Sequence, residues 1–183
     1  KQNWFPYSAS EHCAVRERVG VFDMSSFGKF LLQGPDACKV LNRVGANQVD
    51  VAPGKVVYTQ WLNDQGGIES DLTVTRISED QYLVVTAAAS QMRDLYWLRE
   101  SIRVDERAYV TDVTAGYGVL SVMGPKSREL LAQMTPADLS NDAFEFGTSQ
   151  EIEMGYGLVR ASRISYVGEL GWELYISTKD SKK

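Results

Sequence analysis

Apolar and polar residues alternate over several short segments of this 183-residue chain, and this alternation predicts β-strands. Successive side chains of a strand point to opposite faces of its sheet, so one buried face and one polar face are expected. Leu72 and Val74 should share one face of their strand. Asp71, Thr73 and Thr75 should share the other. The predicted strands span residues 29–33, 55–62, 69–77, 81–86, 108–113 and 118–123, and a final sheet region spans residues 151–176.

Helices are predicted from apolar residues at helical spacing and from residues typical of helix ends. In residues 90–102, the predicted apolar side carries Met92, Leu95, Leu98 and Ile102. Ser10 is a typical N-cap and Gly20 a typical stop, which predicts a helix over residues 10–19. Further helices are predicted over residues 126–134 and from Gly34-Pro35-Asp36 to about residue 44, because proline suits the first helical turn.

One short pattern occurs twice and predicts two related halves. Residues 28–35 read GKFLLQGP and residues 118–125 read GVLSVMGP, and each segment precedes a predicted helix. Strands joined by a glycine-rich turn follow, as in Asn63-Asp64-Gln65-Gly66-Gly67. The predicted fold class is therefore α+β, with two related strand-helix-strand lobes and antiparallel sheets.

Composition and charge narrow the functional classes. A hydrophobic content of 44% with 23% charged residues is ordinary for a soluble globular protein, and no apolar run is long enough to span a bilayer. The net charge of −5, without a long basic block, argues against a nucleic-acid partner. One histidine and two cysteines outside any CxxC pair make a metal site improbable. Two free thiols suggest a reducing compartment, such as the cytoplasm or the mitochondrial matrix.

Common nucleotide-binding and hydrolase motifs do not fit this sequence. Residues 116–121 and 155–160 approach G-x-G-x-x-G, but each lacks the third glycine and the helix that should follow. There is no GxxxxGK[ST], HExxH or GxSxG motif, so FAD, NAD and ATP are not expected to bind by those routes. His12 stands on a predicted helix that otherwise shows Ala14 and Val15, so a Ser-His-Asp triad is not expected.

Two carboxylates are candidates for chemistry because each stands on the second strand of a predicted hairpin, just after a glycine turn. Asp71 follows Gly66-Gly67, and Glu173 follows Gly168. The side chains expected on the face opposite Glu173 and Tyr175 are Trp172, Leu174 and Ile176. This placement suits the wall of a site. The alternative is that these acids, like Tyr58 and Tyr166, simply face water.

Three ordered segments resemble a known family. Residues 20–29, GVFDMSSFGK, resemble the signature near the start of the folate-binding domain of dimethylglycine and sarcosine dehydrogenases. Residues 66–74, GGIESDLTV, are similar to the segment that holds the active-site aspartate of this aminomethyltransferase superfamily. Residues 163–173, RISYVGELGWE, resemble its second hallmark, which the glycine cleavage T-protein shares. The resemblance implies a folate-binding domain over residues 1–183, incomplete at its C-terminal end.

The resemblance also implies roles for individual residues. Asp71 would be the catalytic acid near the folate nitrogens that take up the one-carbon unit. Glu173 would bind the pterin edge, where two parallel donors match a carboxylate. The residues expected to line the pterin pocket or its wall are Tyr58, Thr73, Val85 and Tyr166.

The chain departs from the family pattern at three places. Ser70 stands where many T-proteins have a second acid, so only Asp71 can serve. Thr86 stands where an asparagine is common, which puts that folate contact in doubt. An arginine-bearing helix that normally follows the last strand is absent, so the folate site of this piece is expected to be incomplete.

The function implied by the resemblance is one-carbon transfer to tetrahydrofolate. In the implied parent enzyme, a flavin domain outside this chain, with FAD, oxidises an N-methyl amine to an iminium. Tetrahydrofolate takes up the iminium carbon, which gives methylenetetrahydrofolate and the demethylated amine. Two alternatives stay open: a free-standing T-protein-like aminomethyltransferase, and a non-catalytic regulatory domain of the same fold.

Overall fold

The computed structural model describes residues 2–166 and 168–180. Its chain forms two compact units. The middle unit consists of Ser26–Gly116. The terminal unit consists of the described residues before Ser26 and after Gly116. Each unit contains one antiparallel sheet, which has five strands among the described residues.

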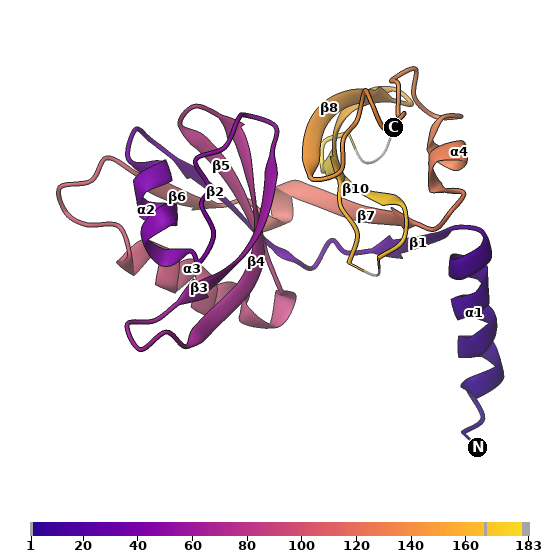
Figure 1. The fold of residues 1–183 in the computed structure, drawn as a ribbon, viewed down its shortest axis with the longest axis horizontal. Helices are drawn as coiled ribbons and strands as arrows, with labels where there is room; N and C mark the ends of the chain where they lie inside the picture. Colours follow the sequence, from indigo (N-terminus) through magenta and orange to yellow (C-terminus); the bar gives the residue numbers. More distant parts are fainter. Residues whose placement is uncertain (1, 167, 181–183) are drawn as a thin grey trace. The chain divides into compact units, whose positions relative to one another are not determined.

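The middle unit is a sheet with two helices packed on one face (Figure 1). Its strand order is β3-β4-β5-β2-β6, and every pair in it is antiparallel. Short 3₁₀ turns occur at Ala88–Ser90 and Thr114–Gly116. In chain order, the elements are β2 (Gly28–Gln33), α2 (Ala37–Val44), β3 (Val56–Leu62), β4 (Ile68–Ser78), β5 (Gln81–Thr86), α3 (Gln91–Glu100) and β6 (Tyr109–Asp112).

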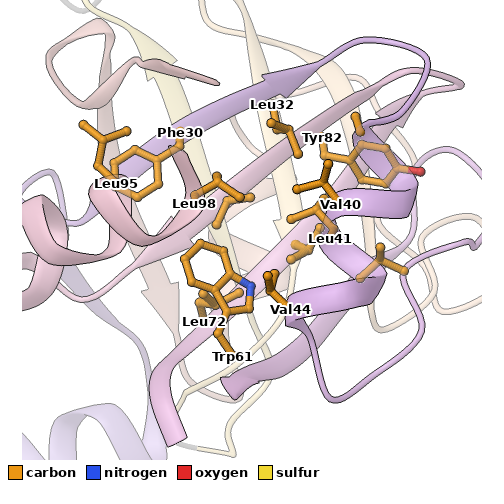
Figure 2. Close-up of a cluster of buried hydrophobic side chains, with 14 residues drawn as sticks. Phe30, Leu32, Val40, Leu41, Val44, Trp61, Leu72, Tyr82, Leu95 and Leu98 are labelled. Carbon is orange, nitrogen blue, oxygen red and sulfur yellow. The ribbon is translucent and has the colours of Figure 1, made fainter. Parts of the chain in front are cut away.

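The core of the middle unit lies between these helices and one face of the sheet (Figure 2). Trp61 is fully buried in this core, close to Leu72 and Val44. Leu72 and Val74 of β4 belong to this core, as the alternation predicted. Asp71 and Thr73, the residues on either side of Leu72, therefore point to the opposite face of the sheet.

The terminal unit has a second sheet, with strand order β1-β7-β10-β9-β8. Trp172 is fully buried in its core, with its ring edge-on to Phe144 at a centroid distance of 6.1 Å. The guanidinium groups of Arg128 and Arg163 lie 5.8 and 5.6 Å from the Trp172 ring centre. In chain order, the elements are α1 (Phe5–Glu17), β1 (Gly20–Asp23), β7 (Tyr117–Met123), α4 (Ser127–Leu131), β8 (Thr148–Met154), β9 (Gly157–Arg163) and β10 (Gly171–Ser177).

The two units repeat one topology, which confirms the related halves predicted from the GKFLLQGP and GVLSVMGP segments. Read from the other end, the second sheet is β8-β9-β10-β7-β1, which matches β3-β4-β5-β2-β6 strand for strand. The edge strands are exchanged between the halves of the chain. β1 precedes β2 in sequence but pairs with β7, whereas β6 precedes β7 but pairs with β2.

Equivalent backbone contacts support this correspondence. Gly34 and Gly124 follow the equivalent strands β2 and β7, with φ of 125° and 131°. A Cβ atom at Gly34 would lie 2.2 Å from the carbonyl oxygen of Arg107, and one at Gly124 would lie 2.6 Å from that of Arg18. Arg107 leads into β6 and Arg18 leads into β1. Each glycine, by lacking a Cβ atom, therefore allows the backbone that leads into β6 or β1 to lie close beside it.

Several predicted element ends differ from the structure. Helix α1 begins at Phe5, with Pro6 in its first turn, so Ser10 lies inside the helix and is not its N-cap. None of the residues of α1 is buried. Met92 is 72% exposed, so it does not extend the apolar side of α3. The short strand β1 was not predicted, and α4 covers only part of residues 126–134.

The contact at Gly34 gives a stability prediction. Gly34→Ala should lower the free energy of unfolding by more than about 3 kcal/mol, because backbone strain adds to a clash with the Arg107 carbonyl. Gly66→Ala is the matched control, since Gly66 also has positive φ but no atom within 4 Å of the added Cβ. It should cost about 1–2 kcal/mol. Urea unfolding measures both values. Equal losses of unfolding free energy in the two variants would show that the contact with the Arg107 carbonyl does not matter.

Candidate functional site

Four of the candidate residues lie on the face of the middle sheet that points away from its helices. Tyr58 of β3 is opposite Thr73 of β4, which is opposite Val85 of β5. Directly opposed residues in a sheet point to the same face, so these three side chains form a row. Asp71 lies two residues before Thr73 and shares that face. The structure thus brings together the four middle-unit residues that the sequence nominated.

The carboxylate of Asp71 is not hydrogen-bonded or ion-paired to any of the described residues. Its partner across the ladder is Gln60 of β3. The Asp71 side chain is exposed, and it makes no hydrogen bond or ion pair with another described residue. A carboxylate in this state can accept a proton or stabilise a positive charge on a molecule bound against this face.

A buried acid that sequence reasoning missed lies on the other side of the same strand. Asp94 of α3 accepts hydrogen bonds at Oδ2 from the hydroxyls of Ser70 and Ser90, each at 2.7 Å, and from the hydroxyl of Thr86. Ser70 immediately precedes Asp71. A helical stripe of residues 90, 94 and 98 is the signal that could have found this acid, because it places Asp94 beside the buried Leu98.

Glu173 occupies the corresponding face of the sheet in the terminal unit, away from the core. Trp172 and Leu174 on either side of it point into that core, as predicted. Across the ladders, Glu173 is opposite Ser121 of β7 and Ser162 of β9. Its residue surface is only 6% exposed, so the alternative that this acid simply faces water is wrong for Glu173.

The ionisation of Glu173 is coupled to that of a buried tyrosine. Burial raises the pKa of Glu173, and a 2.7 Å hydrogen bond from the Tyr175 hydroxyl to Oε2 acts in the opposite direction. Burial and the neighbouring Glu173 carboxylate raise the pKa of Tyr175. Oε1 of Glu173 has no hydrogen-bond partner among the described residues. The side chain therefore keeps an acceptor for a ligand N–H group while Tyr175 fixes its orientation.

The remaining candidate, Tyr166, lies in the loop between β9 and β10 and not on a strand. Its side chain is 92% exposed. Val167, beside it in the quoted motif, lies outside the described residues. A role for Tyr166 in a pterin pocket stays a prediction.

The described part of the chain contains no group of three or more His, Cys, Asp or Glu side chains arranged to hold a metal ion. None of the helices in residues 2–166 and 168–180 is both long and apolar enough to cross a membrane.

Comparisons with known proteins identify relatives of this chain. The family described as GCVT N-terminal domain matches residues 1–183. The 4-methylaminobutanoate oxidase (formaldehyde-forming) of Paenarthrobacter nicotinovorans is 44% identical over 97% of this chain and 21% of its own length. The mitochondrial dimethylglycine dehydrogenase of Mus musculus is 38% identical over 99% of this chain and 21% of its own length.

A solved structure shows the same fold. The glycine cleavage system aminomethyltransferase T from Bartonella henselae superposes with a TM-score of 0.81 and 24% identity, over 94% of this chain and 46% of that one. The predicted α+β class and the resemblance to aminomethyltransferases and dimethylglycine dehydrogenases are thus confirmed. The chain spans about one fifth of the length of the two enzymes above.

The raised pKa of Glu173 gives a pH prediction. A carboxyl group with a raised pKa binds its proton more tightly in the folded than in the unfolded chain. The free energy of unfolding therefore falls as the pH rises from the ordinary value of 4.5 through the raised pKa. Glu173→Gln removes this titration. At pH values above the raised pKa, the variant should therefore have a higher free energy of unfolding than the parent. The difference between the two should shrink as the pH falls below 4.5.

Urea unfolding between pH 3.5 and pH 8 measures this difference. Glu153→Gln is the control, because Glu153 is an exposed carboxylate on β8 of the same sheet and lacks the burial of Glu173. Identical pH profiles for the parent and Glu173→Gln would contradict the assigned effect of burial.

Proposed function

Because this chain belongs to the GCVT N-terminal domain family, an aminomethyltransferase-type family, we propose that it binds tetrahydrofolate and directs a one-carbon unit to it. The observation that carries the proposal is Glu173, an almost fully buried carboxylate with one oxygen held by Tyr175 and the other without a partner among the described residues. Buried charged groups are costly unless they are paired, so a ligand that supplies N–H donors accounts for this arrangement.

The residues present fit the pterin end of a folate. A pterin edge carries a ring N–H and an exocyclic amino group that point the same way. A carboxylate can accept both donors in charge-assisted hydrogen bonds, and Oε2 has a second lone pair beyond the one that Tyr175 uses. We assign Tyr58, Thr73, Val85 and Tyr166 to the pocket wall as part of the same proposal.

Asp71 is the proposed catalytic residue. When bound, tetrahydrofolate supplies the two nitrogens that take up the carbon, and uptake from an iminium releases the amine and one proton. The Asp71 carboxylate stabilises the positive charge of the incoming iminium and accepts a proton, since no described side chain engages it. A carboxylate held in place before the reaction begins is more effective than one that must reorient.

We also propose that the iminium comes from a flavin domain of a longer parent protein. The names of two relatives, an oxidase that forms formaldehyde and a dimethylglycine dehydrogenase, describe oxidation of N-methyl amines. FAD would bind in that other domain. The proposed location is the cytoplasm, or the mitochondrial matrix in a eukaryote.

Isothermal titration of folinic acid into the full-length parent protein tests the proposal. Glu173→Gln should weaken binding roughly 10–100-fold, because it removes the charge from hydrogen bonds worth about 1.5–3 kcal/mol. Glu153→Gln, the exposed control on β8, should bind like the parent.

Unchanged affinity in Glu173→Gln would show that this carboxylate does not hold the pterin edge. Absence of any folinic acid binding by the full-length parent would instead favour a regulatory domain of the same fold.

A further inference from the structure

We propose that Asp94 is a positioning residue for Asp71, which it holds in place through Ser70. The inference deepens the proposed function, on which it rests, by identifying how this fold fixes its catalytic acid. Asp94 does not lie on the face that carries Asp71. It acts from the helix side of the sheet.

The first observation is the burial and complete engagement of the Asp94 carboxylate. The residue is 1% exposed, although carboxylates are seldom buried unless they are paired. Three hydroxyl groups donate to Oδ2, while Nε and an amino group of Arg93 lie 3.2 Å from Oδ1. These donors come from the two strands β4 and β5 and from the start of helix α3, so the Asp94 carboxylate links all three elements.

The second observation is that Asp94 and Arg93 also bind β4 at Glu69 and Ser70, the two residues before Asp71. The Ser70 hydroxyl binds Asp94 directly. The Arg93 guanidinium, which pairs with the same carboxylate, also donates to the backbone oxygen of Glu69. Ser70 and Asp71 are neighbours in β4 and point to opposite faces of the sheet. Contacts that hold the Ser70 side chain and the backbone at Glu69 therefore also limit the movement of Asp71.

The third observation explains why β4 needs support here. The ladder between β3 and β4 is regular from Val56 to Trp61 and then slips by one residue, which leaves Glu69 without a partner in register. Such a bulge bends the strand and disrupts the ladder locally. Asp71 therefore belongs to the second-last regular pair of the β3–β4 ladder before this bulge. The contacts from α3 replace the constraint that a ladder pair at Glu69 would have supplied.

The fourth observation is that the same carboxylate ties in the end of β5. Thr86, the last residue of β5, donates to Asp94 and lies 3.3 Å from the Ser70 hydroxyl. Thr86 is also opposite Leu72, the residue after Asp71. Both neighbours of Asp71 are thus linked to the Asp94 cluster, one through its side chain and one through the ladder.

The test is the fate of the carbon during turnover of the full-length parent protein with tetrahydrofolate. Iminium carbon that is not taken up is lost by hydrolysis: water attacks it, the carbon–nitrogen bond breaks, and the amine, formaldehyde and a proton leave. The ratio of methylenetetrahydrofolate to formaldehyde is counted per iminium formed, so it does not depend on the amount of active enzyme. A control variant that is destabilised elsewhere in the middle unit separates positioning from loss of stability.

Asp94→Asn should lower this ratio on the order of tenfold, because a small displacement of a catalytic group is costly. Ser70→Ala removes only the link to β4 and should lower it in the same direction. Hydrogen exchange of the amides at residues 69–72 in the unliganded protein should become faster in both variants. In an Asp71→Asn background, Asp94→Asn should have no further effect on the ratio.

Glu106→Gln is the matched control. Glu106 is another buried carboxylate of the middle unit, bound by Arg43 at 2.6 and 2.8 Å, and it makes no hydrogen bond or ion pair with β4 among the described residues. Its replacement should lower stability and leave the ratio unchanged.

The outcomes distinguish the positioning role of Asp94 from the proposed catalytic role of Asp71. If Asp71→Asn lowers the ratio but Asp94→Asn and Ser70→Ala do not, the positioning role is overturned and the proposed function stands. An equal drop from Asp94→Asn with and without Asp71 also overturns it. If Asp71→Asn itself leaves the ratio unchanged, the proposed catalytic acid is wrong and the inference fails with it. Should Asp94→Asn fail to fold, Ser70→Ala alone decides.

Discussion

A β-strand can send only every second side chain into the core of its own sheet, and both candidate acids depend on this alternation. In each unit the apolar core lies on one face of the sheet. Leu72 and Trp172 must enter these cores, so their neighbours Asp71 and Glu173 must point the other way. A shift of one residue in either strand would bury an acid in the core, and this makes the register of β4 and β10 strongly specified.

Much of the fold could be predicted from the sequence because it follows from local patterns. The strand over residues 81–86 and the turn at residues 63–67 match the structure, since alternation and glycine-rich turns are signals that a few residues carry. The exchange of β1 and β6 could not be predicted, because strand partners are set by contacts between distant segments. Ser10 misled for a local reason: Pro6 also suits a first helical turn, and the helix begins there.

The candidate site was predicted in part. Tyr58, Thr73 and Val85 fall in one row with Asp71 nearby, which no single segment could reveal without the ladder register. Asp94 was missed because an acid within a helix ordinarily faces water. Its partners Ser70 and Thr86 are two of the three places where the sequence departs from the family pattern. These departures therefore have a physical role in this chain, as hydroxyl donors to one buried carboxylate.

The proposed folate site depends on the buried carboxylate of Glu173, on the face of its sheet opposite the apolar core. A crystal structure of the full-length protein with folinic acid is the experiment that decides whether this carboxylate holds the pterin. The pterin N–H and amino groups should then lie within hydrogen-bond distance of Glu173. A pterin bound elsewhere, with Glu173 contacting only protein groups, would show that the assignment is wrong.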